Sequence, residues 1–80
     1  MEGKQQVTIY VSNNCSESNK LIHFLKELGI SYEIKNITED KKNLKELQEQ
    51  HIYATPVTMV NNHKILGFQK HKLESELIRL

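Results

Sequence analysis

The chain lacks most of the residues that staple small secreted domains or build membrane segments. Its 80 residues include one cysteine, one proline and no tryptophan, so an internal disulfide is excluded. The first six residues are polar, and no apolar run is long enough to span a bilayer. We therefore expect a cytoplasmic protein without a signal peptide or membrane segment, in which Cys15 is normally reduced.

A charge excess of one sign is also missing. The chain has 11 basic and 10 acidic residues, a formal net charge of +1, and its aromatic residues are two phenylalanines and three tyrosines. This composition provides neither the basic footprint of a nucleic-acid or membrane-surface protein nor a platform on which bases stack. The length predicts a single domain over residues 1–80, with about 60% of the unfolded surface buried.

What is present is a regular succession of apolar patterns. Stretches rich in β-branched residues predict strands, and apolar residues at a spacing of 3.6 predict helices. The predicted strands are 6–11, 30–37, 57–60 and 63–66. The predicted helices are 15–28, ending at Gly29, then one N-capped by Thr38 and reaching about Gln50, and a short C-terminal one containing Leu73, Leu77, Ile78 and Leu80.

The order of these elements is β-α-β-α-β-β-α. The first two strands, with a helix between them, should be parallel and joined by a right-handed crossover. Asn61 and Asn62 join the last two strands in a hairpin, because asparagine tolerates the positive φ that such a turn requires. We predict an α/β fold with a four-stranded mixed sheet and three helices on its faces.

Cys15 lies where the first predicted strand gives way to the first helix. A thiol at a helix N-terminus faces unpaired backbone N–H groups and the positive end of the helix dipole, and both favour the thiolate. The polar neighbours from Asn13 to Ser18 favour an accessible thiol over a buried apolar one. Glu17 acts in the opposite direction, because a carboxylate beside the sulfur disfavours a second negative charge. The sequence leaves the net direction of the pKa shift open.

Ser18 follows Cys15 by three residues, where two-thiol oxidoreductases carry a second sulfur. Its hydroxyl either donates to the Cys15 thiolate or satisfies backbone groups of the first helical turn. An oxygen cannot resolve a mixed disulfide, so exchange at this site would be monothiol. Cys15 would attack a mixed disulfide, and an outside thiol would release it.

Three short segments point to a known family. They are Val7-Thr8-Ile9-Tyr10 followed by Cys15-x-x-Ser18, then Ala54-Thr55-Pro56-Val57, and finally Gly67-Phe68. They resemble the first strand and active-site turn, the cis-proline segment and the Gly-Phe stretch of the thioredoxin superfamily, and of glutaredoxins in particular. The resemblance covers residues 7–80. Among subfamilies, the chain is most similar to the small glutaredoxin-like redoxins that serve ribonucleotide reductase.

The resemblance implies a thioredoxin-like (glutaredoxin) fold and a thiol–disulfide oxidoreductase working by a monothiol mechanism. It implies Cys15 and Ser18 as catalytic residues. The substrate groove that it implies is formed by Asn14, Ser16, Thr55, Pro56, Gly67 and Phe68. The Thr55–Pro56 bond would be cis, with the Thr55 backbone facing Cys15 and pairing with the substrate chain. The alternatives are a simple strand-entry proline, packing of the Phe68 ring under the last helix, and a core role for Tyr10 instead of one near the groove.

Three departures from the family bear on substrate and cofactor. Ser12 stands where many glutathione-using members have lysine, Gln69 replaces an acidic residue, and Ser16-Glu17 replaces the Gly-Phe of the iron–sulfur monothiol class. We therefore expect no required cofactor and disfavour a [2Fe–2S] cluster. The four histidines show no ligand spacing, so we expect no metal site. The expected partners of a monomeric chain are a low-molecular-weight thiol as co-substrate or a protein disulfide, together with a thiol–disulfide reductase.

Two other functions stay open. A cluster carrier would use Cys15 of two protomers, with outside thiols, to hold a [2Fe–2S] centre. A redox-inactive binding module would keep the groove and lack the chemistry, an option that Glu17 and the missing second sulfur favour.

Overall fold

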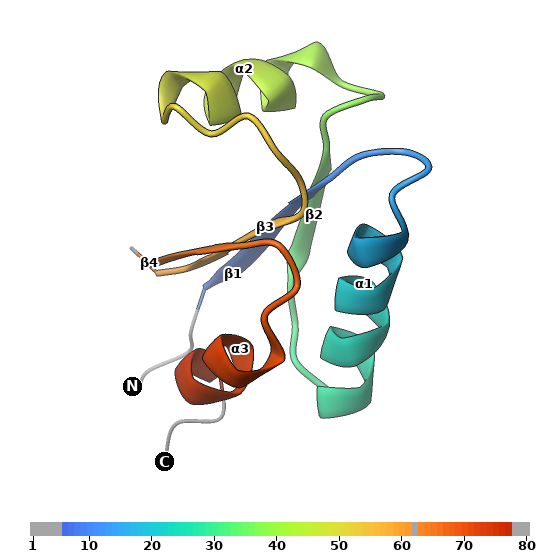
Figure 1. Cartoon of the computed structure of the whole chain (residues 1–80), viewed down its shortest axis with the longest axis vertical. Coiled ribbons are helices and arrows are strands. Elements are labelled where there is room, and N and C mark those ends of the chain that lie inside the picture. The colour runs from blue at the N-terminus through green and yellow to red at the C-terminus, as the bar shows by residue number, and fades with distance from the viewer. Residues whose placement is uncertain (1–5, 62, 78–80) are drawn as a thin grey trace.

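The computed structural model describes residues 6–61 and 63–77, and its elements follow the predicted order (Figure 1). The strands are β1 (Val7–Val11), β2 (Glu33–Asn36), β3 (Val57–Val60) and β4 (His63–Leu66). The helices are α1 (Ser16–Leu28), α2 (Lys41–Glu49) and α3 (Lys70–Leu77). The predicted positions Asn62, Ile78 and Leu80 lie outside the described residues.

The four strands form one mixed sheet in the order β2-β1-β3-β4, which confirms the predicted thioredoxin-like architecture. β1 runs parallel to β2 and antiparallel to β3, and β3 and β4 form the predicted antiparallel hairpin. The hairpin turn begins at Asn61, whose φ of 56° is the positive value expected there. Tyr10 lies opposite Val57, so the end of β1 is beside the start of β3.

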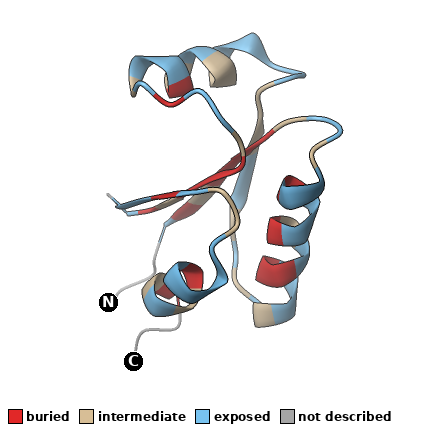
Figure 2. Cartoon of the chain, viewed as in Figure 1, coloured by how far each residue is buried: buried red, intermediate tan, exposed pale blue. Residues whose placement is uncertain are grey.

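Helices cover both faces of the sheet, and each face has its own core (Figure 2). The larger core joins α1 and α3 to the sheet, and its buried members are Val7, Ile9, Val11, Leu21, Phe24, Leu25, Val60, Ile65, Leu73 and Leu77. The smaller core lies under α2 and consists of Tyr10, Leu47, Ile52 and Val57. Leu47 is the buried residue of α2 itself, so this helix presents only a thin apolar face to the sheet.

The end of α1 sets the start of β2. Gly29 has a left-handed φ of 70°, its N–H donates to the Lys26 carbonyl at 3.0 Å, and the Ile30 N–H donates to the Leu25 carbonyl at 3.2 Å. These bonds form the predicted glycine C-cap. They also hold Ile30 against the helix, which delays the strand. Because β2 ends at Asn36, the prediction of a strand over 30–37 is too long at both ends.

The predicted N-cap of α2 is also wrong. Asp40 caps this helix, because its side chain accepts the Lys42 N–H at 3.0 Å. The Asn36 side chain explains why Thr38 does not: its Oδ1 accepts the N–H groups of Thr38 at 2.8 Å and Glu39 at 3.0 Å. Asn36 thereby holds the chain in a turn and delays the helix by two residues.

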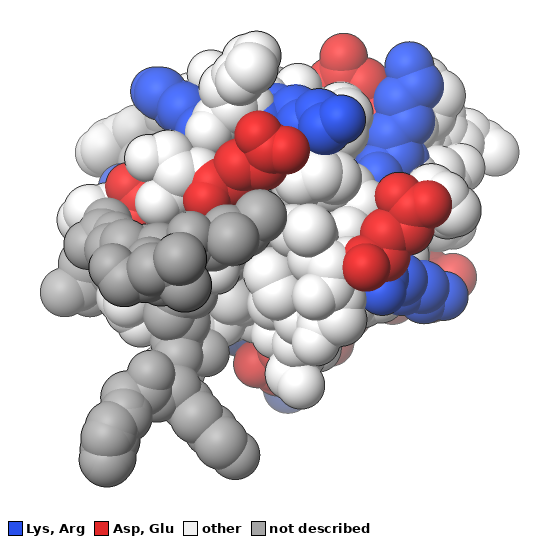
Figure 3. All heavy atoms as spheres, turned by 90° about the horizontal axis from the view of Figure 1, so that it is seen from below, with Lys and Arg blue, Asp and Glu red and all other residues white. Residues whose placement is uncertain are grey.

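The surface mixes charges of both signs. On the face shown in Figure 3, lysine and acidic side chains lie near one another instead of forming fields of one sign. On this face, therefore, positive and negative charges are mixed at close range, as the balanced composition suggests. Among the described residues, no helix has the length and apolar character needed to cross a membrane.

Thr58 puts a polar atom into the larger core. It lies between Ile9 and Ile65 in the sheet and is 0% exposed, and its Oγ1 has no hydrogen-bond partner among the described residues. A buried hydroxyl without a partner costs about 1–3 kcal/mol. The Thr58 hydroxyl therefore lowers the free energy of unfolding, and no hydrogen bond among the described residues offsets this cost.

We expect Thr58→Val, which keeps the shape of the side chain, to raise the free energy of unfolding by about 1 kcal/mol in urea denaturation. The control is Thr8→Val, which changes a half-exposed threonine of the same sheet and should shift stability by less than about 0.5 kcal/mol. A less stable Thr58→Val protein would contradict the absence of a partner for this hydroxyl.

Candidate active site

Cys15 is the N-cap residue of α1, one position before the helix begins. Its backbone is extended, with φ −111° and ψ 108°, and its carbonyl accepts the Asn19 N–H at 3.2 Å. The side chain is half-buried, so it is not the enclosed apolar residue of the alternative interpretation. The thiol therefore lies where the first-turn N–H groups of a helix are unpaired.

The loop between β1 and α1 is anchored to the end of β2. The Asn13 N–H donates to Thr38 Oγ1 at 3.0 Å, and Asn36 Nδ2 donates to Asn13 Oδ1 at 3.0 Å. Asn14 turns the chain with a φ of 59°. Asn14 and Ser16, which flank the cysteine, are both exposed, and their contact with a substrate stays a prediction.

The segment that ends at Pro56 lies opposite Cys15. The Thr55–Pro56 peptide bond is cis, as the resemblance implies. Cys15 Sγ lies 4.0 Å from the Thr55 carbonyl oxygen, at the long limit for a thiol donor. The Gly67 N–H donates to the Pro56 carbonyl at 2.7 Å. These contacts bring Cys15, Thr55, Pro56 and Gly67 to one end of the sheet.

Phe68 and Tyr10 pack into the interior. Phe68 is partly buried against the larger core, and its ring meets that of Phe24 edge to face at 5.7 Å. Tyr10 is 5% exposed in the smaller core, and its hydroxyl donates to Glu46 Oε1 at 3.0 Å. Lys35 donates to the same oxygen at 2.9 Å and lowers the pKa of Glu46. The structure thus supports the packing interpretation for both rings, and a substrate contact by Phe68 stays a prediction.

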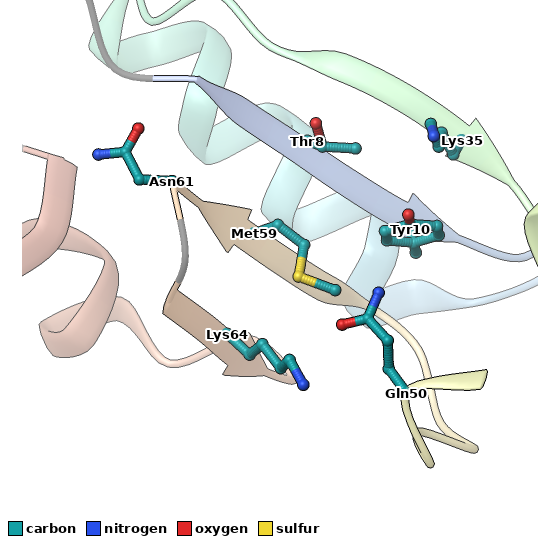
Figure 4. A pocket seen from close by; sticks show the side chains of 7 residues that line it. All are labelled: Thr8, Tyr10, Lys35, Gln50, Met59, Asn61 and Lys64. Atoms are coloured by element: carbon teal, nitrogen blue, oxygen red, sulfur yellow. The ribbon is translucent and has the colours of Figure 1, made fainter. Parts of the chain in front are cut away.

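A separate hollow of about 350 Å³ lies on the sheet face that carries Tyr10 (Figure 4). It is lined by Thr8, Tyr10, Lys35, Gln50, Met59, Asn61 and Lys64. No predicted site residue lines this hollow, and Lys35 is already paired with Glu46. It is therefore not part of the Cys15 site. Within residues 6–61 and 63–77, no three His, Cys, Asp or Glu side chains gather in a way that could hold a metal ion.

Ser18 lies on the inner side of the first turn of α1. It is 1% exposed, and its Oγ has no hydrogen-bond partner among the described residues. The alternative role, in which Ser18 satisfies backbone groups of the first turn, is therefore not seen. A buried hydroxyl without a partner is uncommon in folded proteins. Ionisation of Cys15 would give this hydroxyl a strong acceptor.

Hydrogen-bond donors lower the pKa of the Cys15 thiol. The Ser18 hydroxyl contributes most, followed, against an opposing effect of burial, by the Ser18 N–H, the Thr55 side chain and the Glu17 N–H. No charged side chain is among these causes. The Glu17 carboxylate instead lies toward Gly67, where an added Cβ would be 3.7 Å from Oε1. The net direction, which the sequence left open, is toward the thiolate.

Ser12 is a site residue that the sequence does not reveal. Its Oγ lies 2.8 Å from Thr55 Oγ1, across 43 positions of the chain. Ser12 follows β1 and Thr55 precedes Pro56, so the bond joins the two segments that meet at Cys15. No local pattern encodes such a contact, and the one available signal is the position of Ser12 three residues before the cysteine.

Comparison with known proteins agrees with this geometry. The sequence profile of the family described as Glutaredoxin matches residues 7–65, which is more than half of the chain. No curated protein gives a significant match in sequence.

Solved structures share this fold over most of the chain. The thioredoxin-like protein BC3987 has a TM-score of 0.85 at 25% identity, with 90% of this chain and 100% of that chain covered. The glutaredoxin grx-1 from Archaeoglobus fulgidus has a TM-score of 0.78 at 28% identity, with coverage of 98% and 90%. The glutaredoxin-like protein NrdH-redoxin from Escherichia coli shares the fold with a TM-score of 0.74 at 22% identity, with coverage of 80% and 84%. With its profile match and its cysteine at the strand–helix junction, the chain belongs to the glutaredoxin family of the thioredoxin superfamily.

Proposed function

We propose that this chain is a glutaredoxin-like thiol–disulfide oxidoreductase that acts on mixed disulfides through Cys15 by a monothiol mechanism. Membership of the family supports thiol–disulfide exchange in general. The observation that carries the monothiol form is a half-buried lone cysteine beside a buried serine, Ser18, in place of a second sulfur. The Ser18 hydroxyl also contributes most to lowering the pKa of the thiol. A serine at position 18 can stabilise the Cys15 thiolate, but it cannot attack the mixed disulfide that Cys15 forms.

Exchange proceeds in two displacements. The Cys15 thiolate attacks one sulfur of a mixed disulfide and forms a new S–S bond with it, while the other sulfur leaves as a thiolate and takes a proton from water. An outside thiolate then attacks the substrate sulfur of the new mixed disulfide and releases Cys15 as a thiolate. The outside thiol ends in a disulfide with the substrate sulfur, so each turnover releases one thiol, consumes one thiol and keeps one disulfide bond. No resident cofactor is required.

The site residues act on both displacements. The Ser18 hydroxyl and the N–H groups of Ser18 and Glu17 hold the negative charge when Cys15 is the nucleophile and again when it is the leaving group. A leaving thiol of lower pKa departs faster, so the same donors favour release. The Thr55 backbone, next to the sulfur, is suited to pair with an extended substrate chain as an added strand. Asn14, Ser16, Pro56, Gly67 and Phe68 would border that chain.

The proposed partners are a low-molecular-weight thiol or a protein disulfide, with a thiol–disulfide reductase as electron source. Ser12 and Gln69 are neutral where glutathione-using family members carry a lysine and an acidic residue, which disfavours glutathione as the specific substrate. We propose that the chain works as a cytoplasmic monomer, because a single Cys15 and an outside thiol complete the reaction.

The two alternatives have less support. A [2Fe–2S] carrier would need two copies of the chain and two outside thiols, because each chain supplies one cysteine sulfur. A redox-inactive binding module would have no use for donors that lower the pKa of its single thiol.

We expect Cys15→Ser to reduce exchange to the uncatalysed rate, because the nucleophile is removed. The measurement is the thiol-dependent release of a fluorescent peptide from its mixed disulfide with 2-mercaptoethanol, a small thiol without the carboxylates of glutathione. Ser31→Ala, at an exposed serine ahead of β2, is the control and should keep full activity. Full activity in Cys15→Ser would exclude the proposed mechanism.

We expect Ser18→Ala to raise the pKa of Cys15, because it removes the largest contribution to the thiolate. Below the pKa, alkylation by iodoacetamide should slow about three- to tenfold, whereas at high pH the two proteins should react equally fast. Stability should not fall, since the lost hydroxyl has no partner when Cys15 is neutral. An unchanged alkylation profile would contradict the role of Ser18.

We expect Ser18→Cys to convert the site to dithiol chemistry, because the second sulfur can resolve the mixed disulfide internally. The oxidised variant should carry an internal disulfide, seen as the loss of two hydrogens in its intact mass. It should also reduce insulin with dithiothreitol as donor, which the unmodified chain should not do. An intact mass that stays unchanged after oxidation would argue against this alignment of positions 15 and 18.

A further inference from the structure

The hydroxyls of Ser12 and Thr55 form a link beside Cys15 whose direction decides what it does. The two oxygens are 2.8 Å apart, and either one can be the donor. A hydroxyl has one hydrogen to give and two lone pairs to receive with. If Thr55 donates to Ser12, its hydrogen is used up in that bond. If Ser12 donates to Thr55, the Thr55 hydrogen stays available for another acceptor.

The Cys15 sulfur lies beside the same residue and would be such an acceptor once it is ionised. The thiol lies 4.0 Å from the Thr55 carbonyl oxygen, and the Thr55 side chain is among the groups that favour its ionised form. An anion orients nearby hydroxyl hydrogens toward itself, and successive hydroxyls that donate in one direction strengthen one another. Ser12 and Thr55 are both half-buried, so water competes less with the hydrogen bonds between their hydroxyls and the sulfur.

We propose that Ser12 is a positioning residue for the reacting sulfur: its hydroxyl donates to Thr55 Oγ1, which directs the Thr55 hydrogen onto the Cys15 thiolate. This inference rests on the proposed function for its purpose and adds a residue that does not touch the sulfur. The sulfur then has neutral donors on two sides: Ser18 from α1, and Thr55 from the segment before Pro56. Glu17 is the nearest charged residue in the chain, and its carboxylate lies toward Gly67.

The test is a double-mutant cycle read by the pH dependence of iodoacetamide alkylation. Ser12→Ala and Thr55→Val should each raise the apparent pKa of Cys15, so that alkylation below the pKa slows about threefold. Because Ser12 acts through Thr55, adding Ser12→Ala to Thr55→Val should cause no further loss. Ser12→Thr and Thr55→Ser, which keep the hydroxyls, should restore the original profile, and Ser31→Ala should not move it.

Three outcomes would overturn the proposal. A lower pKa in Ser12→Ala would mean that Ser12 takes the Thr55 hydrogen and competes with the sulfur. An unchanged pKa, or an equal shift in the Thr55→Val background, would mean that Ser12 does not act through Thr55. Thermal unfolding of Ser12→Ala and Thr55→Val, compared with that of the hydroxyl-keeping variants, identifies any effect that comes from a damaged fold. Alkylation requires no disulfide exchange, so this result is independent of whether the chain proves to be an oxidoreductase.

Discussion

The antiparallel pairing of β1 with β3 is the constraint on which the site depends. Because Tyr10 faces Val57 in this register, the residues that follow β1 must meet the residues that precede β3. One strand therefore delivers Cys15 and the other delivers Thr55 to the same end of the sheet, although they are 40 residues apart. A shift of the register by one residue would turn both side-chain sets to the wrong faces and separate the two segments.

The helix that begins after Cys15 completes the site from the other side. Its inner face is bound to the larger core through Leu21 and Leu25, which are both 0% exposed. This packing fixes the direction of the first-turn N–H groups and excludes solvent from the Ser18 hydroxyl. Hydrophobic burial several residues away therefore holds the donors in place before the sulfur ionises, so they stabilise the thiolate without having to reorganise.

Much of this arrangement can be predicted from local sequence patterns, and the rest depends on contacts that no local pattern encodes. The element order, the Gly29 cap and the accessible cysteine follow from periodicity and capping preferences. The burial of Ser18 also has a local signal, because it precedes Leu21 by three residues and Leu25 by seven, on one helical face. The Thr38 cap fails because Asn36 competes for the same backbone groups.

The hydrogen bond between Ser12 and Thr55 depends on such a contact, because the sequence places both residues near the site but does not show that their hydroxyls meet across 43 positions. The substrate contacts of the groove residues are not encoded locally either, because they concern a molecule outside the chain.

The donors that favour the Cys15 thiolate are hydroxyls and backbone amides, and none of their principal contributions comes from a charged side chain. Mobile ions screen interactions between full charges and leave short-range hydrogen bonds nearly untouched. The contributions that lower the pKa of Cys15 are therefore of a kind that ionic strength affects little. A thiol activated in this way keeps nearly the same pKa at low and at physiological ionic strength.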